Sequence, residues 1–344
     1  MQKKRVTIVE VAKSAGVSVG TVSNVLNRHN AVPLAEETVR KVNEAIRTLG
    51  YRRNVIAANL SRQKTFELGM LIPSYDEYFV KFTGAVEQIV LERGYHLSVF
   101  SASEKPELER RHLELMLQRR VDGLFCHGLA MSPETAGNIV SDGTPVVMFN
   151  AWDWPDIDVG AVNLDVVSVC AQAVVHLFEQ GCRAIFYLGL KQASSTDEQR
   201  RIGFLNGTAS LPQSDVLTGI LEFEPGWLKE MEKQSAGIRP IGVLCFDDYV
   251  AFSFMSKLLE LGYRVPEEVK IIGINNSFIS RTSFPGMTSI AIPYKLQAQA
   301  AVRSMMERLG EASFDAPETR GSGGSAGSPV QIPLQLVPRK STEL

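Results

Sequence analysis

Polar and aromatic side chains follow several short apolar runs of this chain, at positions suited to holding a small molecule. Serine and tyrosine come after the run Leu68–Ile72, asparagine and tryptophan after Val146–Phe149, and two aspartates after Gly242–Phe246. Carboxylates, amides and flat aromatic rings together suit a polyhydroxylated ligand such as a sugar. The candidate ligand-binding residues at these positions are Ser74, Tyr75, Tyr78, Phe79, Asn150, Trp152, Asp247, Asp248 and Asn275.

Two of these residues have a structural interpretation that is equally good. Asp248 stands where an aspartate would cap the next helix. Trp152 could belong to the core instead of offering a ring for a ligand to stack on.

Catalytic and metal-binding patterns are absent from the sequence. There is no P-loop, GxGxxG, HExxH or CxxC, and the four cysteines Cys126, Cys170, Cys182 and Cys245 are far apart. The segment 321–328, GSGGSAGS, formally matches GxSxG but lacks the strand and helix that a nucleophile elbow requires. We therefore expect no enzyme activity, no metal and no cofactor.

The apolar runs alternate with helical patterns from residue 67 onward. The expected strands are Leu68–Ile72, Leu97–Ser101, Gly123–His127, Val146–Asn150, Ala184–Gly189, Gly242–Phe246 and Lys270–Ile274, and Val330–Val337 is expected as a last strand. The expected helices are Phe79–Arg93, Leu108–Gln118, Val167–Gln180 and Tyr249–Leu261. This alternation predicts parallel sheets covered by helices, and the number of strands favours two doubly wound lobes with a cleft between them.

The beginning of the chain differs from the rest in charge. Residues 1–64 carry 12 lysines and arginines against 4 aspartates and glutamates, whereas residues 65–344 carry 24 against 34. A basic head on an acidic body favours binding of a polyanion such as DNA, and a basic solvated face without a partner is the alternative that charge alone allows.

The same head has the pattern of a helix-turn-helix. Thr7 and Glu10 form a T-x-x-E capping box that predicts a helix start. Gly16 can make a tight turn, and Ser18 can then cap a second helix that runs to about Leu26. A third amphipathic helix is expected over Glu36–Leu49.

The stretches VTIVEVAKSAGVSVGTVSNVLN, EETVRKVNEAIRTLGYRRN and VIAANLSR resemble the DNA-binding head and hinge of the LacI/GalR (lactose-repressor) family. The resemblance places the second helix in the major groove, where Val19, Gly20 and Asn24 would read bases. Phosphate contacts would position the head. The residues that the resemblance assigns to DNA binding are Thr7, Ser18, Val19, Gly20, Thr21, Ser23, Asn24, Asn27, Tyr51, Asn54, Ala57 and Leu60.

Residues 51–64 would be the hinge of such a protein. Asn54 can cap a short helix there, and Leu60 matches the leucine that the family wedges into the minor groove. A simple packing contact is the alternative for Leu60. The order of domains is then residues 1–50, the helix-turn-helix; 51–64, the hinge; and 65–344, the effector-binding and dimerisation domain.

Further stretches, among them QRRVDGLF, RRIGF and LGYRVPEEVKIIGINN, resemble the family's body, which is similar to periplasmic binding proteins. The resemblance assigns an N-lobe to about residues 65–162 and 292–320, and a C-lobe to about 163–291 and 329–340. It also places Arg200, ahead of a helix carrying RIGF, as an arginine that grips the effector. The sequence departs from the family at Asp247 and at Asn275-Asn276, and residues 207–240 look short enough to lack a helix or strand.

The expected protein is a homodimeric repressor that binds operator DNA under the control of a sugar-like effector. The chain has no apolar run long enough to cross a membrane and no secretory signal, so we expect it in the cytoplasm. A solute-binding protein of a transport system is the alternative that the body alone would allow.

Overall fold

The computed structural model describes residues 6–26, 34–51, 64–102, 105–151, 156–192, 194–212, 214–311 and 329–343, except for the side chain of Pro106. Contacts divide the chain into two units, Met1–Thr65 and Phe66–Leu344. Among the described residues no helix is long and apolar enough to cross a membrane.

The first unit contains three short helices around a small core. They are α1 (Ile8–Ala15), α2 (Val19–Leu26) and α3 (Glu36–Leu49). The capping box is confirmed, because the Thr7 backbone N–H donates to Glu10 Oε2 at 2.7 Å and Thr7 Oγ1 accepts from the Glu10 N–H. Gly16 ends α1 at φ 67°, and Ser18 Oγ accepts the Thr21 N–H at 3.0 Å. The core consists of Val11, Ala12, Val22, Val42 and Ala45.

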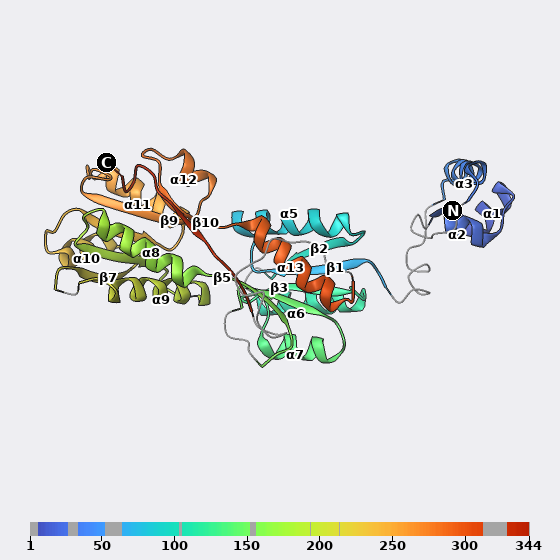
Figure 1. Cartoon of the computed structure of the whole chain (residues 1–344), viewed down its shortest axis with the longest axis horizontal. Helices are drawn as coiled ribbons and strands as arrows, with labels where there is room; N and C mark the ends of the chain where they lie inside the picture. Colours follow the sequence, from blue (N-terminus) through green and yellow to red (C-terminus); the bar gives the residue numbers. More distant parts are fainter. Residues whose placement is uncertain are drawn as a thin grey trace. The chain divides into compact units, whose positions relative to one another are not determined.

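The second unit has two six-stranded sheets (Figure 1). The N-lobe sheet has the order β11-β5-β4-β3-β1-β2, and its strands are β1 (Glu67–Ile72), β2 (His96–Ser101), β3 (Gly123–His127), β4 (Val146–Phe149), β5 (Gly160–Leu164) and β11 (Val330–Ile332). The C-lobe sheet has the order β12-β10-β9-β8-β6-β7, with β6 (Ala184–Gly189), β7 (Leu217–Glu222), β8 (Ile241–Cys245), β9 (Val269–Asn275), β10 (Thr288–Ala291) and β12 (Gln335–Val337). Every pairing is parallel except that of β10 with β12.

Helices cover both sheets. Those of the N-lobe are α5 (Glu77–Glu92), α6 (Pro106–Gln118), α7 (Pro133–Ser141) and α13 (Tyr294–Arg308). Those of the C-lobe are α8 (Val166–Glu179), α9 (Ser195–Ala209), α10 (Trp227–Ser235), α11 (Asp248–Glu260) and α12 (Phe278–Thr282). The sequence prediction of a helix-turn-helix head and a body of two doubly wound α/β lobes is confirmed.

The described chain passes between the lobes at three points: after β5, after β10 and between β11 and β12. Figure 1 shows these segments running between two lobes that lie end to end. A strand that passes from one lobe to the other must leave the first sheet before it pairs in the second. Two expectations from the sequence are therefore wrong. Val330–Val337 is not one strand, and 329–340 does not lie wholly in the C-lobe, because Val330–Ile332 pairs with β5 of the N-lobe.

The expectation that residues 207–240 lack a helix or strand is wrong. That segment holds both β7 and α10, and β7 pairs with β6 along its whole length. The strand is an edge strand with mostly exposed or half-exposed residues. It therefore lacks the continuous apolar run by which the central strands were recognised.

Candidate functional site

The helix-turn-helix presents the start of α2 to solvent. Val19 is 41% exposed, Gly20 and Ser18 are exposed, and Asn24 is half-buried, while Val22 on the opposite face is fully buried. Of the other predicted DNA contacts, Thr7 is exposed, whereas Thr21, Ser23 and Tyr51 are half-buried. Asn27, Asn54, Ala57 and Leu60 lie outside the described residues.

A cleft with a volume of about 620 Å³ lies between the two lobes. The N-lobe contributes the residues after β1, β3 and β4, and the C-lobe contributes α9 and the residues after β6, β8 and β9. Seven of the predicted ligand-binding residues line it: Ser74, Tyr78, Phe79, Asn150, Arg200, Asp247 and Asn275. The structure thus brings together residues that are up to two hundred positions apart in sequence.

Arg200 projects into this cleft from α9. The helix begins at Ser195, so Arg200 lies inside it and not ahead of it as the sequence suggested. Gly203 lets α9 pack closely on α8, since a Cβ atom there would come within 2.6 Å of the Val167 carbonyl oxygen. This close packing fixes the position of the Arg200 side chain one turn earlier.

Arg200 is buried, with only 6% of the residue's surface exposed. Its Nη1 donates to the Phe246 carbonyl oxygen at 2.5 Å, and its Cζ lies 4.2 Å from the centre of the Phe246 ring. The Nε atom has no hydrogen-bond partner among the residues that the structure describes. A buried guanidinium N–H without a partner is costly, so this donor is available to a ligand in the cleft.

At the N-lobe wall of the cleft, three buried side chains form a hydrogen-bonded ring. Asn150 Nδ2 donates to the Tyr78 hydroxyl at 2.8 Å, and Tyr78 donates to Gln297 Oε1 at 3.0 Å. Gln297 Nε2 closes the ring by donating to Asn150 Oδ1 at 3.2 Å. His127 packs beside this ring, with its Nε2 3.5 Å from Asn150 Nδ2. Tyr78 and Asn150 are therefore held rigid by their own lobe.

Burial has opposite effects on the titratable groups of the two walls. It lowers the pKa of His127 to about 3, so the imidazole is neutral at pH 7. It raises the pKa of Asp247, while the Val250 N–H and the charge of Arg200 lower it. Asp247 is the N-cap of α11, and its Oδ1 accepts the Val250 N–H at 2.8 Å.

Two predicted ligand-binding residues do not line the cleft. Tyr75 is 62% exposed outside it. Asp248 is fully buried, and its carboxylate accepts the Ser277 N–H at 2.7 Å and the Ser289 hydroxyl at 2.6 Å. The Asp248 side chain thus ties α12 and β10 together, and the cap predicted for it belongs to Asp247. Trp152 lies outside the described residues.

The two asparagines at the end of β9 have different surroundings. Asn275 lines the cleft, at φ 109°, and its carbonyl oxygen accepts the Tyr294 hydroxyl at 3.1 Å. Asn276 Oδ1 accepts from Arg339 Nη2 at 2.6 Å. Only the first of the pair is placed to contact a ligand.

Sequence reasoning missed several other lining residues. Asp76 and Glu77 begin α5, His127 ends β3, and Gln192, Ser194 and Thr196 precede or begin α9. Asp76 follows the apolar run of β1 as closely as Ser74 does, so the rule that found Ser74 could have found it. The sequence holds no such signal for the residues around α9.

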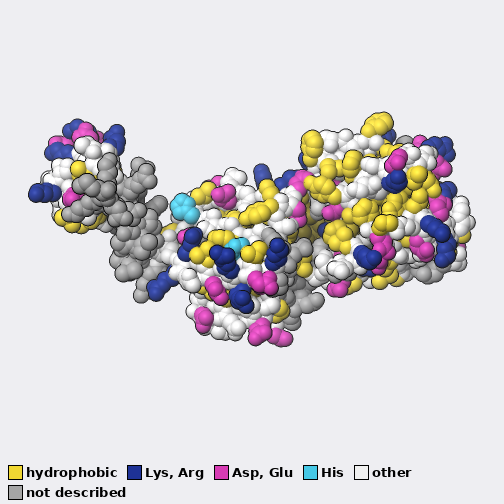
Figure 2. All heavy atoms as spheres, turned by 180° about the vertical axis from the view of Figure 1, so that it is seen from behind, with side chains coloured by type: hydrophobic (Ala, Val, Ile, Leu, Met, Phe, Trp, Pro, Cys, Tyr) yellow, Lys and Arg dark blue, Asp and Glu magenta, His cyan; other side chains and the backbone are white. Residues whose placement is uncertain are grey.

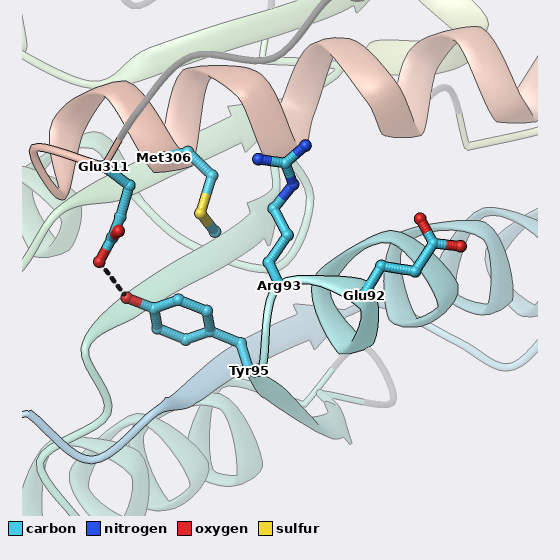
Figure 3. Close-up of a pocket in the computed structure, with 5 residues that line it drawn as sticks. All are labelled: Glu92, Arg93, Tyr95, Met306 and Glu311. Carbon is cyan, nitrogen blue, oxygen red and sulfur yellow. Dashed lines mark hydrogen bonds between the residues drawn. The ribbon is translucent and has the colours of Figure 1, made fainter. Parts of the chain in front are cut away.

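A second hollow of about 450 Å³ lies at the other end of the N-lobe (Figure 3). In Figure 3, Tyr95 points toward Glu311, and its hydroxyl donates to Glu311 Oε1 at 3.1 Å. Burial, and then the charge of Glu311, raise the pKa of Tyr95. Since this contact joins the start of β2 to the end of α13, we interpret the hollow as structural and the cleft as the functional site.

Comparisons with known proteins agree with both units. The pattern of "Bacterial regulatory proteins, lacI family" matches residues 7–54, and that of "Periplasmic binding protein-like domain" matches residues 174–342. The transcriptional repressor PurR of Mannheimia succiniciproducens is 30% identical over 98% of this chain and 98% of its own. Catabolite control protein A of Staphylococcus aureus is 28% identical over 91% of this chain and 95% of its own.

Solved structures show the same fold. The Lac repressor dimer bound to operator and the anti-inducer ONPF has a TM-score of 0.78 at 21% identity, covering 98% of this chain and 99% of that one. A complex of the transcriptional regulator CelR with cellobiose has a TM-score of 0.65 at 21% identity, covering 98% and 100%.

Proposed function

The chain belongs to the LacI family of bacterial regulatory proteins, and we propose that it is a homodimeric repressor whose operator affinity changes when a sugar-like effector occupies the cleft. The family and the relatives identify the chain as a DNA-binding transcription regulator. They exclude the alternative of a solute-binding protein of a transport system. Those relatives are regulators and not enzymes, so we propose that the cleft binds its ligand without transforming it. The site of action would be the cytoplasm, where the operator DNA is.

The unpartnered Arg200 Nε carries the effector part of the proposal. Arg200 is nine-tenths buried, its guanidinium stacks on Phe246 and it lines the cleft, so its Nε–H is arranged to donate to a ligand oxygen. A ligand that contacts both walls binds the closed arrangement of the lobes better than an open one. It therefore favours closure by the difference between its two affinities.

The exposed start of α2 carries the DNA part. Val19 offers methyl groups to a thymine, and Asn24 offers an amide to an adenine edge, both in the major groove. Leu60 would enter the minor groove from the hinge, as the family resemblance implies. One short helix reads few base pairs, so a symmetric dimer on a near-palindromic operator doubles the readout.

An apolar surface on the C-lobe supports the dimer. Phe278 and Phe284 are 64% and 94% exposed, and Phe252 of α11 is 39% exposed. Figure 2 shows hydrophobic side chains gathered on the lobe at the right of that view. Exposed apolar patches of this kind mark interaction surfaces, and a second copy of the chain is the partner that the proposed symmetry requires.

Selection of bound duplexes from random DNA by the full chain, followed by titration at low and moderate salt, tests the proposal. We expect a near-palindromic sequence whose affinity falls steeply as salt rises, because lysines and arginines displace counterions from phosphates. Recovery of unrelated sequences, or an affinity independent of salt, would contradict it.

A further inference from the structure

Two arginines follow one another in α9, and the structure gives them different partners. Arg200 lines the cleft, where its Nη1 donates to the Phe246 carbonyl oxygen at 2.5 Å. Arg201 reaches back along the helix, and its Nε donates to Asp197 Oδ2 at 2.7 Å. Successive side chains are about 100° apart around the axis of an α-helix, so the two arginines start in different directions. Their final positions depend on what each of them binds.

Asp197 is a fully buried carboxylate with two strong donors. The Tyr187 hydroxyl of β6 donates to Oδ1 at 2.6 Å, and Arg201 supplies the donor to Oδ2. The group lies against Gly189 at the end of β6, where an added Cβ atom would come within 3.0 Å of both Arg201 Nη2 and Asp197 Oδ1. A buried carboxylate without a cation is strongly destabilising. Arg201 supplies the positive charge that Asp197 requires.

Arg200 is a second cation close to this carboxylate. Both Asp197 and Arg200 are on the buried face of α9, three positions apart, and side chains at that spacing are neighbours on a helix. Burial raises the pKa of the Tyr187 hydroxyl well above its usual value, and the charge of Arg200 is the largest influence that lowers it. Arg200 therefore lies near enough to Tyr187 and Asp197 to replace Arg201 as the partner of the carboxylate.

We propose that Arg201 is a positioning residue for the effector site: by holding the Asp197 carboxylate, it keeps this charge from pairing with Arg200 and leaves the Arg200 Nε–H to a ligand in the cleft. The inference rests on the proposed function, since it takes the cleft as the effector site. Arg201 also fixes the wall beside Arg200, because its Nη2 donates at 2.8 Å to the carbonyl oxygen of Leu190, which lines the cleft. Asp197 and Arg201 are not themselves lining residues, so they act on a ligand through their neighbours.

Two substitutions distinguish this role from a purely structural one. Arg201→Met removes the cation and leaves the buried carboxylate, which should then draw Arg200 away from Phe246. Adding Asp197→Asn removes the charge that attracts Arg200, so the double variant should keep Arg200 beside Phe246. A purely structural role for Arg201 predicts the reverse, because two substitutions in one buried group then disturb the site at least as much as one.

Crystal structures of the full-length chain with Arg201→Met and with the double substitution, at neutral pH and without added ligand, test the position of Arg200 directly. Arg183→Met is the matched control. Arg183 is half-buried in the same lobe, donates to backbone carbonyl oxygens and does not contact Asp197. Arg201→Lys, which restores a cation, is the conservative variant.

Thermal unfolding of each variant shows whether it is folded. If Arg201→Met does not fold, Arg201→Gln takes its place in the comparison, because glutamine keeps an N–H donor for Asp197 and still removes the charge.

We expect Arg200 within hydrogen-bond distance of Asp197 in Arg201→Met, and stacked on Phe246 in the double variant, in Arg201→Lys and in Arg183→Met. An Arg200 that keeps its place in Arg201→Met, or that leaves it in the double variant, overturns the proposal.

Calorimetric titration with glucose, ribose and cellobiose measures the consequence for binding. A sugar that binds the wild type should bind Arg201→Met about tenfold more weakly, and the double variant within a few fold of the wild type. Equal binding by all three proteins would overturn the positioning role. Failure of every sugar to bind the wild type would count against the proposed effector, whereas the crystal structures decide on Arg201 without a ligand, so the two failures are distinguishable.

Discussion

Acidification should destabilise this protein through His127. The unfolded chain takes up a proton near pH 6.5, whereas burial lowers the pKa of His127 to about 3 in the folded protein. Between these two values the unfolded state binds more protons than the folded state, so the free energy of unfolding falls as the pH falls. One pKa unit corresponds to about 1.4 kcal/mol. Lowering the pH from 7 to 5 should therefore reduce the free energy of unfolding by about 2 kcal/mol through His127 alone.

Urea unfolding of the wild type and of His127→Phe at both pH values isolates this contribution, since the carboxylates contribute almost equally in the two proteins. Between pH 7 and pH 5, the free energy of unfolding of His127→Phe should fall by about 2 kcal/mol less than that of the wild type. His96→Phe, at an exposed position of β2, is the control and should lose as much as the wild type. Nitrogen NMR of the His127 ring gives a direct check, and we expect an uncharged imidazole throughout this range. Equal losses in all three proteins, or a His127 ring that gains a proton near pH 6, would refute the reasoning.

Three further changes test other parts of the structure. Asp248→Ala removes the acceptor of the buried Ser277 N–H and Ser289 hydroxyl and should lower the free energy of unfolding by about 2–5 kcal/mol in urea titrations; a loss below about 1 kcal/mol would contradict the contacts. Phe278→Asp should convert the dimer to a monomer in analytical ultracentrifugation, because it buries a charge in the proposed apolar interface, and an unchanged dimer would place the interface elsewhere. Asn275→Asp should strengthen binding of a neutral sugar about tenfold through a charge-assisted hydrogen bond and weaken binding of glucose 6-phosphate; calorimetry showing no change in either would remove Asn275 from the ligand contacts.

The central strands were predictable because their burial leaves a continuous apolar run. Gly123–His127 and Ala184–Gly189 have the predicted bounds, and every residue in them is buried. Short strands at the margins leave no such run. The three-residue strands β11 and β12 form one apolar stretch in the sequence. In the structure they belong to the sheets of different lobes.

The sequence predicted those residues of the cleft that directly follow a buried strand. Asn150 and Asp247 were found because they directly follow buried runs that end at one edge of a parallel sheet. His127 was missed because it reads as the last residue of a strand. Its place in the cleft wall depends on the Leu129 N–H, which donates to its Nδ1, and on Asn150, which is oriented by the Leu164 N–H. Such pairings are properties of the folded structure and not of local sequence.

Regulation of DNA binding through the cleft is tested most directly by the operator affinity of the wild type and of Arg200→Ala. Each is measured with and without a sugar that calorimetric titration shows to bind the wild type. Fluorescence anisotropy on the selected duplex would measure it. For the wild type we predict that the sugar changes operator affinity by roughly 5- to 150-fold. Arg200→Ala should bind the operator within a few fold of the wild type in the absence of sugar and should no longer respond to it, because it removes the donor that the ligand needs from the C-lobe. The same response in both proteins, or none in the wild type, would contradict control of DNA binding by a ligand in this cleft.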